Sequence, residues 1–326
     1  MIKRRAFITL LGGAAAWPLA APAQQAPNET AIPTIGFLGP GSANGFVALL
    51  DGFRQGLGAT GFVEGSTVGV EYRWADNQLD RLPALAGELV ARRVALIVTG
   101  SATAAALAAK AATSTIPIVF AVGGDPVKFG LVASMNRPGG NITGVSFLAN
   151  TLLAKQLQLL RGLSAGSGVV GLLVNPGNPN AASDSGMAQS AAATLGLKLH
   201  VVHATAERDF DAAFDDLRRA QATAVLVFPD ALFIDARAPL AELAARHMLP
   251  VLYPDRSFVE AGGLMSYGSS RADGYRLTRR NPLDVDAGFR APQGSHADAR
   301  LCRDTRGCDV GIRQELAAGM ISSRTH

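Results

Sequence analysis

Short apolar runs alternate along the first half of the chain with segments in which apolar residues recur at helical spacing. The runs cover residues 34–38, 95–99 and 116–122, and the helical segments cover 46–57, 79–93 and a stretch ending at 112. Residues 67–74 alternate apolar and polar positions, which predicts a half-covered strand. An apolar run of this length predicts a buried strand, whereas recurrence every three or four positions predicts an amphipathic helix. Strands that alternate with helices in this way predict a parallel sheet.

The second half of the chain repeats this order. Its predicted helices cover residues 152–163, 181–195, 207–220 and a segment ending at 247, and its strands cover 169–174, 198–204, 224–228 and 250–253. Each half closes on a Gly-Gly turn and a short strand, after Gly139-Gly140 and after Gly262-Gly263. The repeat predicts an α/β protein of two similar lobes, lobe 1 at 34–147 and lobe 2 at 148–268. Residues 269–276 are expected to begin a return to lobe 1.

The stretch 116–147 is expected to connect the two lobes. Its buried strand ends at Gly123-Gly124-Asp125-Pro126. Proline suits the first turn of a helix and aspartate suits the position that caps it, so a short helix is predicted to begin at Pro126. A further strand is predicted at 143–147, after which the strand–helix alternation starts again.

Polar residues follow several predicted strands, where ligands bind in open parallel sheets. Hydroxyls and helix N-terminal N–H groups suit a carboxylate, so Ser101 and Thr103 are expected to bind one, and Asp125 or Asp230 an amine. The same residue types also cap helices, and an aromatic residue on a strand, such as Tyr253, often belongs to the core. The candidate ligand-binding residues are Gly41, Ser42, Ser101, Ala102, Thr103, Asp125, Asn175, Asp230 and Tyr253.

Known catalytic patterns are absent from the sequence. His200 and His203 lie three apart on a predicted strand and therefore point to opposite faces, so they do not form a metal-binding pair. The chain has no Gly-x-Ser-x-Gly elbow in a strand context. Gly123-Gly124-Asp125-Pro126 lacks the spacing of a dinucleotide fingerprint and the lysine of a P-loop. We therefore expect no catalytic residue, no metal and no cofactor, and a protein that is not an enzyme.

The N-terminus has the pattern of an export signal. Arg4-Arg5 is followed by Phe7, a weakly apolar segment and Ala21-Pro22-Ala23, which predicts a twin-arginine signal peptide at 1–23 cleaved near Ala23. An ordinary secretory signal with two arginines is the alternative. Gly12-Gly13 and Pro18 interrupt the apolar segment, which is far shorter than the ~20 residues of a membrane span. A soluble mature protein in the periplasm, not inserted in the membrane, is expected.

Removal of the predicted signal also changes the charge balance. The formal net charge of +4 falls to +1 without Lys3, Arg4 and Arg5, since this segment holds no acidic residue. The mature part shows no basic stripe with interleaved aromatic residues, which argues against a nucleic-acid partner. The apolar fraction of 48% is ample for two folded lobes.

Several sequence blocks carry a resemblance to a known family: Arg4 to Gly13, Val70 to Ala75, Arg81 to Ala86, Ile116 to Phe120, Gly124 to Val127, Asn136 to Asn141, Thr143 to Ser146, Asn175 to Asn180 and Glu260 to Gly268. These blocks resemble the substrate-binding proteins of ABC importers, a family that includes tryptophan-binding members. The resemblance implies a type I periplasmic-binding-protein fold, with two doubly wound parallel-sheet lobes and a cleft between them. It also implies a small solute, such as an amino acid, and an ABC permease membrane subunit as partners.

The resemblance ends after Tyr275-Arg276, where the family continues with a helix and a Lys-Gly segment. Residues 277–326 hold eight arginines, no lysine and both cysteines, Cys302 and Cys308. Their apolar residues follow neither period, so a poorly ordered tail is expected. A variable surface tail is one interpretation, and a shifted reading frame is our hypothesis. If neither overlapping frame of the gene encodes the missing helix and Lys-Gly segment, that hypothesis fails.

The sequence therefore predicts an extracytoplasmic solute-binding protein that delivers a small polar, amino-acid-like solute to an ABC importer. A periplasmic enzyme would need convergent titratable residues, which the sequence does not supply. A sensory receptor that signals to a kinase has the same sequence pattern, and neighbouring permease and ATPase genes would distinguish transport from sensing. The altered tail also leaves a damaged, non-functional product as an alternative.

Overall fold

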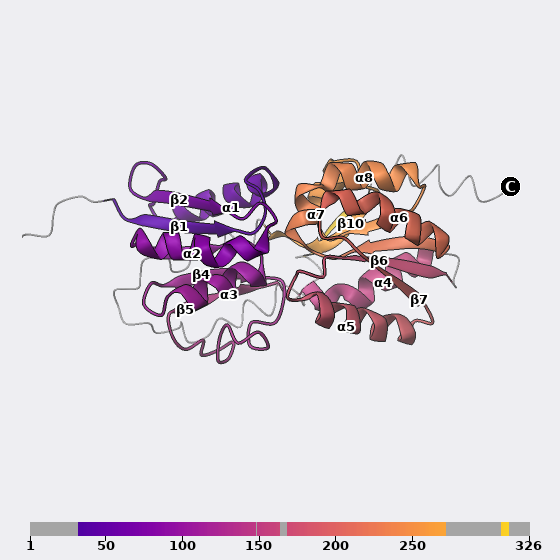
Figure 1. Ribbon diagram of the computed structural model, residues 1–326, viewed down its shortest axis with the longest axis horizontal. Coiled ribbons are helices and arrows are strands. Elements are labelled where there is room, and N and C mark those ends of the chain that lie inside the picture. Colours follow the sequence, from indigo (N-terminus) through magenta and orange to yellow (C-terminus); the bar gives the residue numbers. More distant parts are fainter. Residues whose placement is uncertain (1–31, 148, 164–167, 272–307, 313–326) are drawn as a thin grey trace, which may run out of the picture. The chain divides into compact units, whose positions relative to one another are not determined.

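The computed structural model describes residues 32–147, 149–163, 168–271 and 308–312. All helices and strands of these residues lie in the unit from Pro33 to His326. The predicted signal peptide at 1–23 lies outside the described residues. The predicted alternation of strands and helices is present in the described residues except between the strands Ile118–Val122 and Ile142–Ser146, which no helix separates, and the strands form two sheets (Figure 1).

The first sheet is built from five parallel strands in the order β2-β1-β3-β4-β5. The strands are β1 (Thr34–Gly39), β2 (Gly69–Trp74), β3 (Leu96–Thr99), β4 (Ile118–Val122) and β5 (Ile142–Ser146). The helices between them are α1 (Val47–Gly58), α2 (Leu82–Ala91) and α3 (Thr103–Ala112), and the single turns η1 (Asn44–Phe46) and η2 (Leu79–Arg81) precede α1 and α2.

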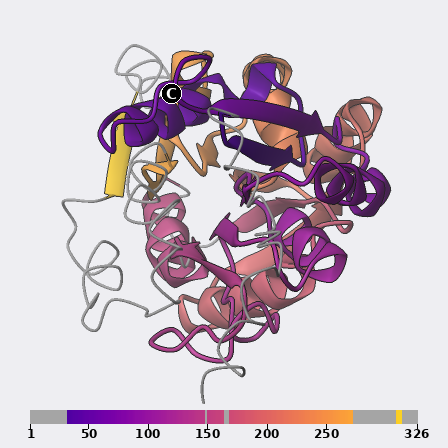
Figure 2. The same ribbon diagram turned by 90° about the vertical axis from the view of Figure 1, so that its left-hand side faces the viewer.

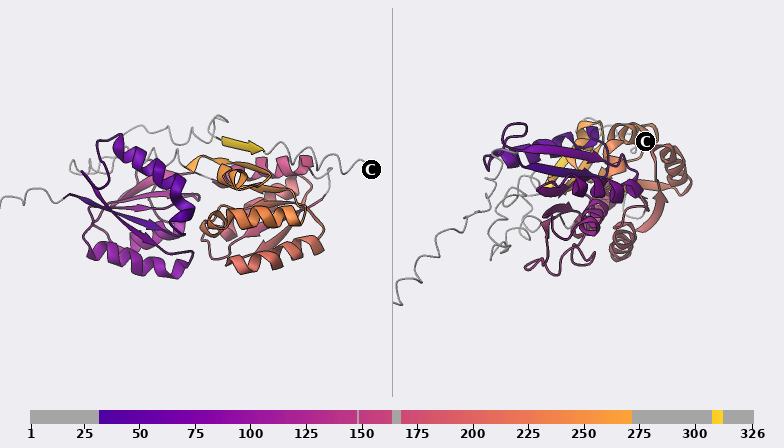
Figure 3. Two further views of the ribbon diagram at one scale, coloured as in Figure 1. Left: turned by 90° about the horizontal axis from the view of Figure 1, so that it is seen from above. Right: turned by 60° about the vertical axis from the view of Figure 1, so that its left-hand side comes forward.

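Both faces of the first sheet are covered by helices (Figure 3). On one face, Phe53 and Leu57 of α1 pack with Ile35 and Phe37 of β1. Alternate residues of a strand point to opposite faces, and the other face is packed against α2 and α3. That second cluster includes Leu38, Ile97, Phe120, Leu85, Leu89, Ala105 and Ala109.

The second sheet has the order β11-β10-β9-β8-β6-β7, and all its strands are parallel except β11. The strands are β6 (Val169–Val174), β7 (Lys198–His203), β8 (Ala222–Val227), β9 (Val251–Tyr253), β10 (Met265–Ser269) and β11 (Cys308–Ile312). The helices are α4 (Leu153–Leu163), α5 (Ala181–Thr194), α6 (Phe210–Arg219), α7 (Ala231–Asp235), α8 (Arg237–Arg246) and α9 (Arg256–Glu260), with η3 (Ala149–Leu152) before α4 and η4 (Glu207–Asp209) before α6.

The second sheet is also covered on both faces (Figures 1 and 2). Leu157 of α4 and Ala188 of α5 pack with Leu172 of β6 and Leu226 of β8. The opposite face packs against α6, α8 and α9. That cluster includes Leu173, Val225, Phe214, Leu217, Leu240, Leu243 and Phe258, all buried at 2% exposure or less.

The two sheets share one winding order. In each, the first strand lies next to the second on one side and next to the third on the other, so the order reverses between β1 and β3 and between β6 and β8. Ligands bind at such switch points, beyond the carboxyl ends of the strands. The loops after β1, β3, β6 and β8 are therefore the candidates for a site.

The predicted short helix at Pro126 is wrong. Residues 126–130 form hydrogen-bonded turns, and Gly130 has a φ of 65°, the left-handed conformation that ends a helical turn. Asp125 does cap this turn, because its Oδ1 accepts the N–H groups of Val127 at 2.9 Å and Lys128 at 3.3 Å. The helix predicted to end at His247 is also divided, into α7 and α8 at Ala236.

Most of the tail predicted to be poorly ordered, residues 277–326, lies outside the described residues. Five of its residues, Cys308–Ile312, form β11. This strand pairs antiparallel with β10 at the edge of the second sheet, with Met265 opposite Ile312 and Ser269 opposite Cys308.

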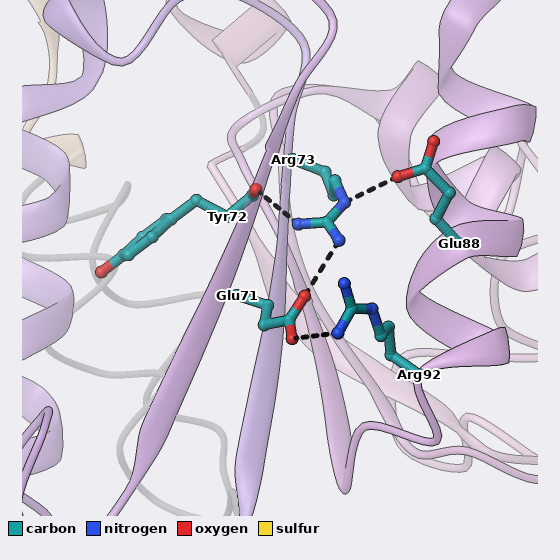
Figure 4. A network of polar contacts seen from close by, with 5 residues as sticks. All are labelled: Glu71, Tyr72, Arg73, Glu88 and Arg92. Atoms are coloured by element: carbon teal, nitrogen blue, oxygen red, sulfur yellow. Dashed lines mark hydrogen bonds and ion pairs between the residues drawn. The ribbon is translucent and has the colours of Figure 1, made fainter.

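Charged residues of β2 and of the C-terminal part of α2 form ion pairs at the edge of the first sheet (Figure 4). Arg73 donates from Nε to Glu88 at 2.8 Å and from Nη2 to Glu71 at 2.9 Å, and Arg92 lies 3.6 Å from Glu71. Charges at a sheet edge hinder pairing with the strands of other chains. We interpret this cluster as protection of the edge strand.

Gly144 of β5 is required by a close approach between two strands. A Cβ atom at this position would lie 2.0 Å from the carbonyl oxygen of Phe120 in β4. Because backbone cannot move away as a side-chain tip can, Gly144→Ala is expected to lower the free energy of unfolding by about 1–3 kcal/mol. Gly186 in α5 is the control, because a Cβ atom there would have no other atom within 4 Å.

The control variant, Gly186→Ala, should raise stability by about 0.5–1 kcal/mol, because alanine is the better helix former. Urea denaturation of both variants measures the two effects. Equal midpoints for Gly144→Ala and the parent would show that β4 and β5 are not packed as closely as the structure places them.

Candidate functional site

A cavity lies where the switch-point loops of both sheets meet, and we call it the switch-point cavity. The first sheet contributes loops after β1, β3 and β4, the second sheet contributes loops after β6, β8 and β9, and the connecting segments complete the wall. The lining residues are Pro40, Phe46, Leu79, Ser101, Ala102, Thr103, Ala104, Gly123, Phe147, Ala149, Leu152, Gln156, Asn178, Pro179, Asn180, Asp184, Pro229, Asp230, Ala231, Ile234, Pro254, Gly268, Ser269 and Arg271.

The N-terminus of α3 opens onto this cavity with an alanine at its cap position. Ala102 has the extended backbone of a helix cap (φ −142°, ψ 132°), but no side chain accepts a hydrogen bond there. The first N–H groups of a helix have no intrahelical acceptor and carry a partial positive charge. Thr103 and Ala104, the first two residues of α3, both line the cavity. This end of the cavity therefore favours an anion.

Thr103 also links the loops of the two sheets. Its side chain is 1% exposed, and its hydroxyl donates to Asn180 Oδ1 at 3.1 Å. Asn180 precedes α5 and also approaches the loop after β4, where a Cβ on Gly124 would lie 2.6 Å from Asn180 Oδ1. The hydroxyl proton of Thr103 is thus already shared with a neighbour, and the free donors at this end are backbone N–H groups.

Asp230, which caps α7, supplies a buried carboxylate to the other side of the cavity. Oδ1 accepts from Asn175 Nδ2 at 3.0 Å and from the N–H of Leu232 at 2.9 Å, while Oδ2 accepts from Asn178 Nδ2 at 2.8 Å. Two lone pairs of Oδ1 and one of Oδ2 are engaged, so Oδ2 retains one acceptor position.

Burial raises the pKa of Asp230, and the hydrogen bonds from Asn175, Asn178 and Leu232 partly offset this effect. An ammonium group is the partner that would best stabilise the ionised form, because an opposite charge nearby favours ionisation. This side of the cavity therefore favours a cation, opposite in sign to the α3 N-terminus.

Apolar side chains cover much of the remaining wall. They come from η1, η2, the segment after β5, η3 and α7: Phe46, Leu79, Phe147, Leu152 and Ile234. The charged side chains besides Asp230 are Asp184, in the first turn of α5, and Arg271, which is ion-paired with Asp255. A solute with an apolar body and two opposite charges at one end matches this arrangement.

The structure brings together four of the nine predicted site residues, Ser101, Ala102, Thr103 and Asp230. Asn175 lies behind them, 8% exposed, and orients Asp230. The sequence reasoning missed Asn178 and Asn180 as site residues. Their position in the loop after β6 indicated a possible role in binding, but the sequence does not distinguish them from the other residues of this loop, 175–180.

The other four candidates lie outside the cavity lining. Gly41 and Ser42 approach Asp235 of α7. Asp125 caps its own turn. Tyr253 is fully buried, stacks on Phe258 and donates its hydroxyl proton to the carbonyl of Leu240 at 3.3 Å, so the structure gives it the role of a core residue.

Metal-binding clusters and membrane-spanning helices are both absent from the described residues. His, Cys, Asp and Glu side chains of this part of the chain nowhere gather in a group of three or more that could hold a metal ion. Within the same residues, every helix is too short or too polar to cross a membrane.

Comparisons with known proteins show which proteins this chain is similar to. A tyrosine-binding protein of Clostridioides difficile (strain R20291) is 24% identical over 217 residues, which span 67% of this chain and 62% of that relative. A conserved domain protein of Vibrio cholerae has a TM-score of 0.74 at 24% identity and covers 89% of this chain and 94% of its own. An ABC domain from Streptococcus pneumoniae in complex with L-Trp has a TM-score of 0.74 at 20% identity, with coverage of 88% and 94%.

The predicted fold class is confirmed, since the doubly wound parallel sheets match periplasmic binding proteins of type I. The model of the family described as ABC transporter substrate binding protein matches residues 35–276. The match ends directly before the stretch that departs from the family pattern. It covers well over half of the chain, which therefore belongs to the ABC transporter substrate-binding protein family.

Proposed function

We propose that this protein binds an α-amino acid in the switch-point cavity and delivers it to an ABC importer. The observation that carries the proposal is the pairing of an alanine-capped helix N-terminus with a buried carboxylate on the wall of one cavity. An α-amino acid has an anion and a cation on the same carbon, so one small molecule carries a partner both for the α3 N-terminus and for Asp230.

In the proposed complex, the solute carboxylate accepts hydrogen bonds from the first N–H groups of α3. Helix N-termini bind carboxylates in this way because their N–H groups are unsatisfied and the helix dipole is positive there. The solute ammonium donates to Oδ2 of Asp230. Ser101 and Thr103 support the carboxylate with their hydroxyls, and Thr103 does so by exchanging its contact with Asn180.

The apolar wall supports a solute with an apolar or aromatic side chain. Phe46, Leu79 and Phe147 offer carbon surface on which such a side chain would be removed from water. The relatives named as tyrosine-binding and as complexed with L-Trp support the same class. Aromatic amino acids are therefore the first solutes to test.

The proposal includes export and binding rather than catalysis. The predicted twin-arginine signal at 1–23 supports a periplasmic location, and family membership supports an ABC permease as the partner. Asp230 is engaged by three donors that hold it as an acceptor, which suits recognition of a cation. In the proposal, the two lobes, each built around one of the two sheets, close around the solute, and the closed, loaded form is presented to the permease.

Calorimetric titration of the full chain tests the proposal. L-tyrosine and L-tryptophan should bind, whereas tyramine, without the carboxylate, and 3-(4-hydroxyphenyl)propionate, without the amine, should bind at least about 100-fold more weakly, because each leaves one buried charged or polar end unpaired. Analogues that bind as tightly as L-tyrosine would contradict the assignment of the two ends.

The double variant Ser101→Ala/Thr103→Ala is expected to weaken binding of L-tyrosine about tenfold. The two hydroxyls contribute roughly one neutral hydrogen bond's worth of affinity each, while the backbone N–H groups of α3 remain. Ser190→Ala/Thr194→Ala is the matched control, since these hydroxyls bond to the backbone of α5 on its exposed side. Unchanged affinity of the Ser101/Thr103 variant rejects the hydroxyl roles.

A further inference from the structure

A second contact between the two sheets lies outside the cavity lining and centres on Asp235, the last residue of α7. Its Oδ2 accepts the backbone N–H of Ser42 at 2.7 Å and Nδ2 of Asn77 at 2.8 Å. Ser42 lies in the loop after β1 and Asn77 in the loop after β2, whereas Asp235 follows β8 of the second sheet. One carboxylate oxygen at the end of α7 therefore accepts hydrogen bonds from two loops of the first sheet.

The first sheet's loops form a recess of the right shape for this carboxylate. A Cβ on Gly45 would lie 1.6 Å from Asp235 Oδ1, and a Cβ on Gly41 would lie 2.9 Å from Oδ2. The absence of side chains at both positions is what admits Asp235. Oδ1 is buried and has no hydrogen-bond partner within the described part of the chain.

The recess is held in place by contacts within the first sheet's loops. The N–H of Asn77 donates to the carbonyl of Pro40 at 2.9 Å, and the N–H of Asp76 donates to that of Gly41 at 3.1 Å. Asp76 and Asn77 both have positive φ angles, 51° and 63°. Aspartate and asparagine adopt this conformation more readily than other residues with a side chain, and the two backbone hydrogen bonds hold Asn77 next to the loop that carries Ser42, so the donors are preorganised to receive the carboxylate.

Asp235 is also connected to the binding site along the chain. Helix α7 spans only five residues, begins after Asp230 and carries Ile234, and both of these residues line the switch-point cavity. Asp235 itself does not line the cavity. A contact at the end of α7 thus ties the segment that bears the amine-binding carboxylate to the loops of the first sheet.

We propose that Asp235, with Ser42 and Asn77, forms a clasp that favours the arrangement in which the two sheets' loops meet, and that it positions the cavity without contacting the solute. The effect on solute affinity rests on the proposed function, but the clasp itself does not. Affinity for a solute scales with the populated fraction of the binding-competent arrangement. The clasp would therefore set affinity through that fraction.

Fluorescence energy transfer between a dye on the lobe of the first sheet and a dye on the lobe of the second sheet tests the clasp without any solute. Dyes on Val63→Cys and Met187→Cys report the distance, since both native side chains are exposed, at 55% and 42%, and Cys302 and Cys308 are replaced by serine in the labelled protein. Asp235→Ala should broaden and lengthen the distance distribution and weaken L-tyrosine binding about tenfold, because the competent fraction falls. Asp235→Asn keeps one oxygen in the recess and should recover most of both losses.

Two further variants separate a clasp from a general loss of stability. Asn77→Gly tolerates the positive φ and removes only the side-chain donor, so it should shift the distances in the same direction as Asp235→Ala. Asp209→Ala removes a carboxylate that accepts N–H groups of Thr205 at 2.8 Å and Ala206 at 3.0 Å within the second sheet's unit, and it should leave the distances unchanged.

The proposal is overturned if Asp235→Ala and Asn77→Gly leave the distance distribution of the solute-free protein at the parent's values, or if Asp209→Ala shifts it equally. A failure of every amino acid to bind would instead reject the proposed function, and the solute-free distances would still decide on the clasp. A changed distance distribution with unchanged affinity for L-tyrosine would reject the link between the clasp and the cavity.

Discussion

Replacing Asp230 by asparagine is expected to lower the affinity for L-tyrosine about 100-fold or more. The substitution keeps the size of the side chain and removes the charge that pairs with the solute ammonium. Truncating one partner of a buried charge pair typically costs about 2–5 kcal/mol, much of it from the charge left unpaired. Calorimetric titration at neutral pH measures the loss.

Asp125→Asn is the matched control for this variant. Both aspartates were candidates for the amine from the sequence, but Asp125 accepts the N–H groups of its own turn and lies outside the cavity lining. Its replacement should leave the affinity within about twofold of the parent, a difference well below 1 kcal/mol. The reverse ranking of the two variants would assign the amine to Asp125.

The ionisation of Asp230 predicts that the affinity for the solute depends on pH. Burial raises the pKa of Asp230 above the ordinary aspartate value. Because the solute ammonium pairs with the ionised form, affinity should be full above that pKa and should decline as the pH falls through it, beginning at a higher pH than for an exposed aspartate. The weak binding of Asp230→Asn should lack this decline, which separates Asp230 from other titrating groups.

Ala102→Asp is the second substitution for which a large effect is expected, and it should act on affinity and stability in opposite directions. An aspartate at this cap position would accept the N–H groups at the start of α3 and should stabilise the protein by about 1 kcal/mol. Its carboxylate would occupy the place of the solute carboxylate and repel it, so L-tyrosine should bind at least about 100-fold more weakly.

Ala102→Asn separates charge from capping. Asparagine caps a helix about as well as aspartate and has nearly the same size, so its stability gain should be similar. Without the negative charge, it should bind L-tyrosine more tightly than Ala102→Asp. Thermal unfolding and calorimetry of both variants make the comparison. A stabilised Ala102→Asp protein that still binds L-tyrosine with parental affinity would exclude the α3 N-terminus as the carboxylate site.

Much of the fold could be predicted from the sequence because several strands, such as β4 and β6, are continuous apolar runs with clear ends. The run at 169–174 matches β6 residue for residue, since Gly168 and Asn175 bound it on both sides. The helix predicted at Pro126 is wrong because capping signals indicate only where a helix begins, whereas the length of the helix depends on the residues that follow. Gly130 ends that segment after a single set of turns.

The candidate site was predictable only in part, because strand order is not contained in the alternation of strands and helices. Ser101, Thr103 and Asp230 line the cavity since β3 and β8 lie at switch points. Asp125 and Tyr253 follow or belong to strands that look the same in the sequence. The side chain of Asp125 caps its own turn, and the side chain of Tyr253 lies in the core. Tertiary packing, not the local sequence, determines both orientations.

The contacts between the loops of the two sheets could not be predicted at all. Thr103 and Asn180 are 77 residues apart, and Ser42 and Asp235 are 193 residues apart. Nothing local marks these pairs, because asparagine and aspartate after a strand also cap the helix that follows. The contact of Asp235 with Ser42 and Asn77 also depends on Gly41 and Gly45, which leave room for its carboxylate.

A crystal structure of the full chain with L-tyrosine tests the central claim most directly. We predict that the solute carboxylate lies within about 3 Å of the backbone nitrogens of Thr103 and Ala104, and its ammonium within the same distance of Asp230 Oδ2. A solute with its carboxylate directed away from α3, or one bound outside the switch-point cavity, would contradict the account.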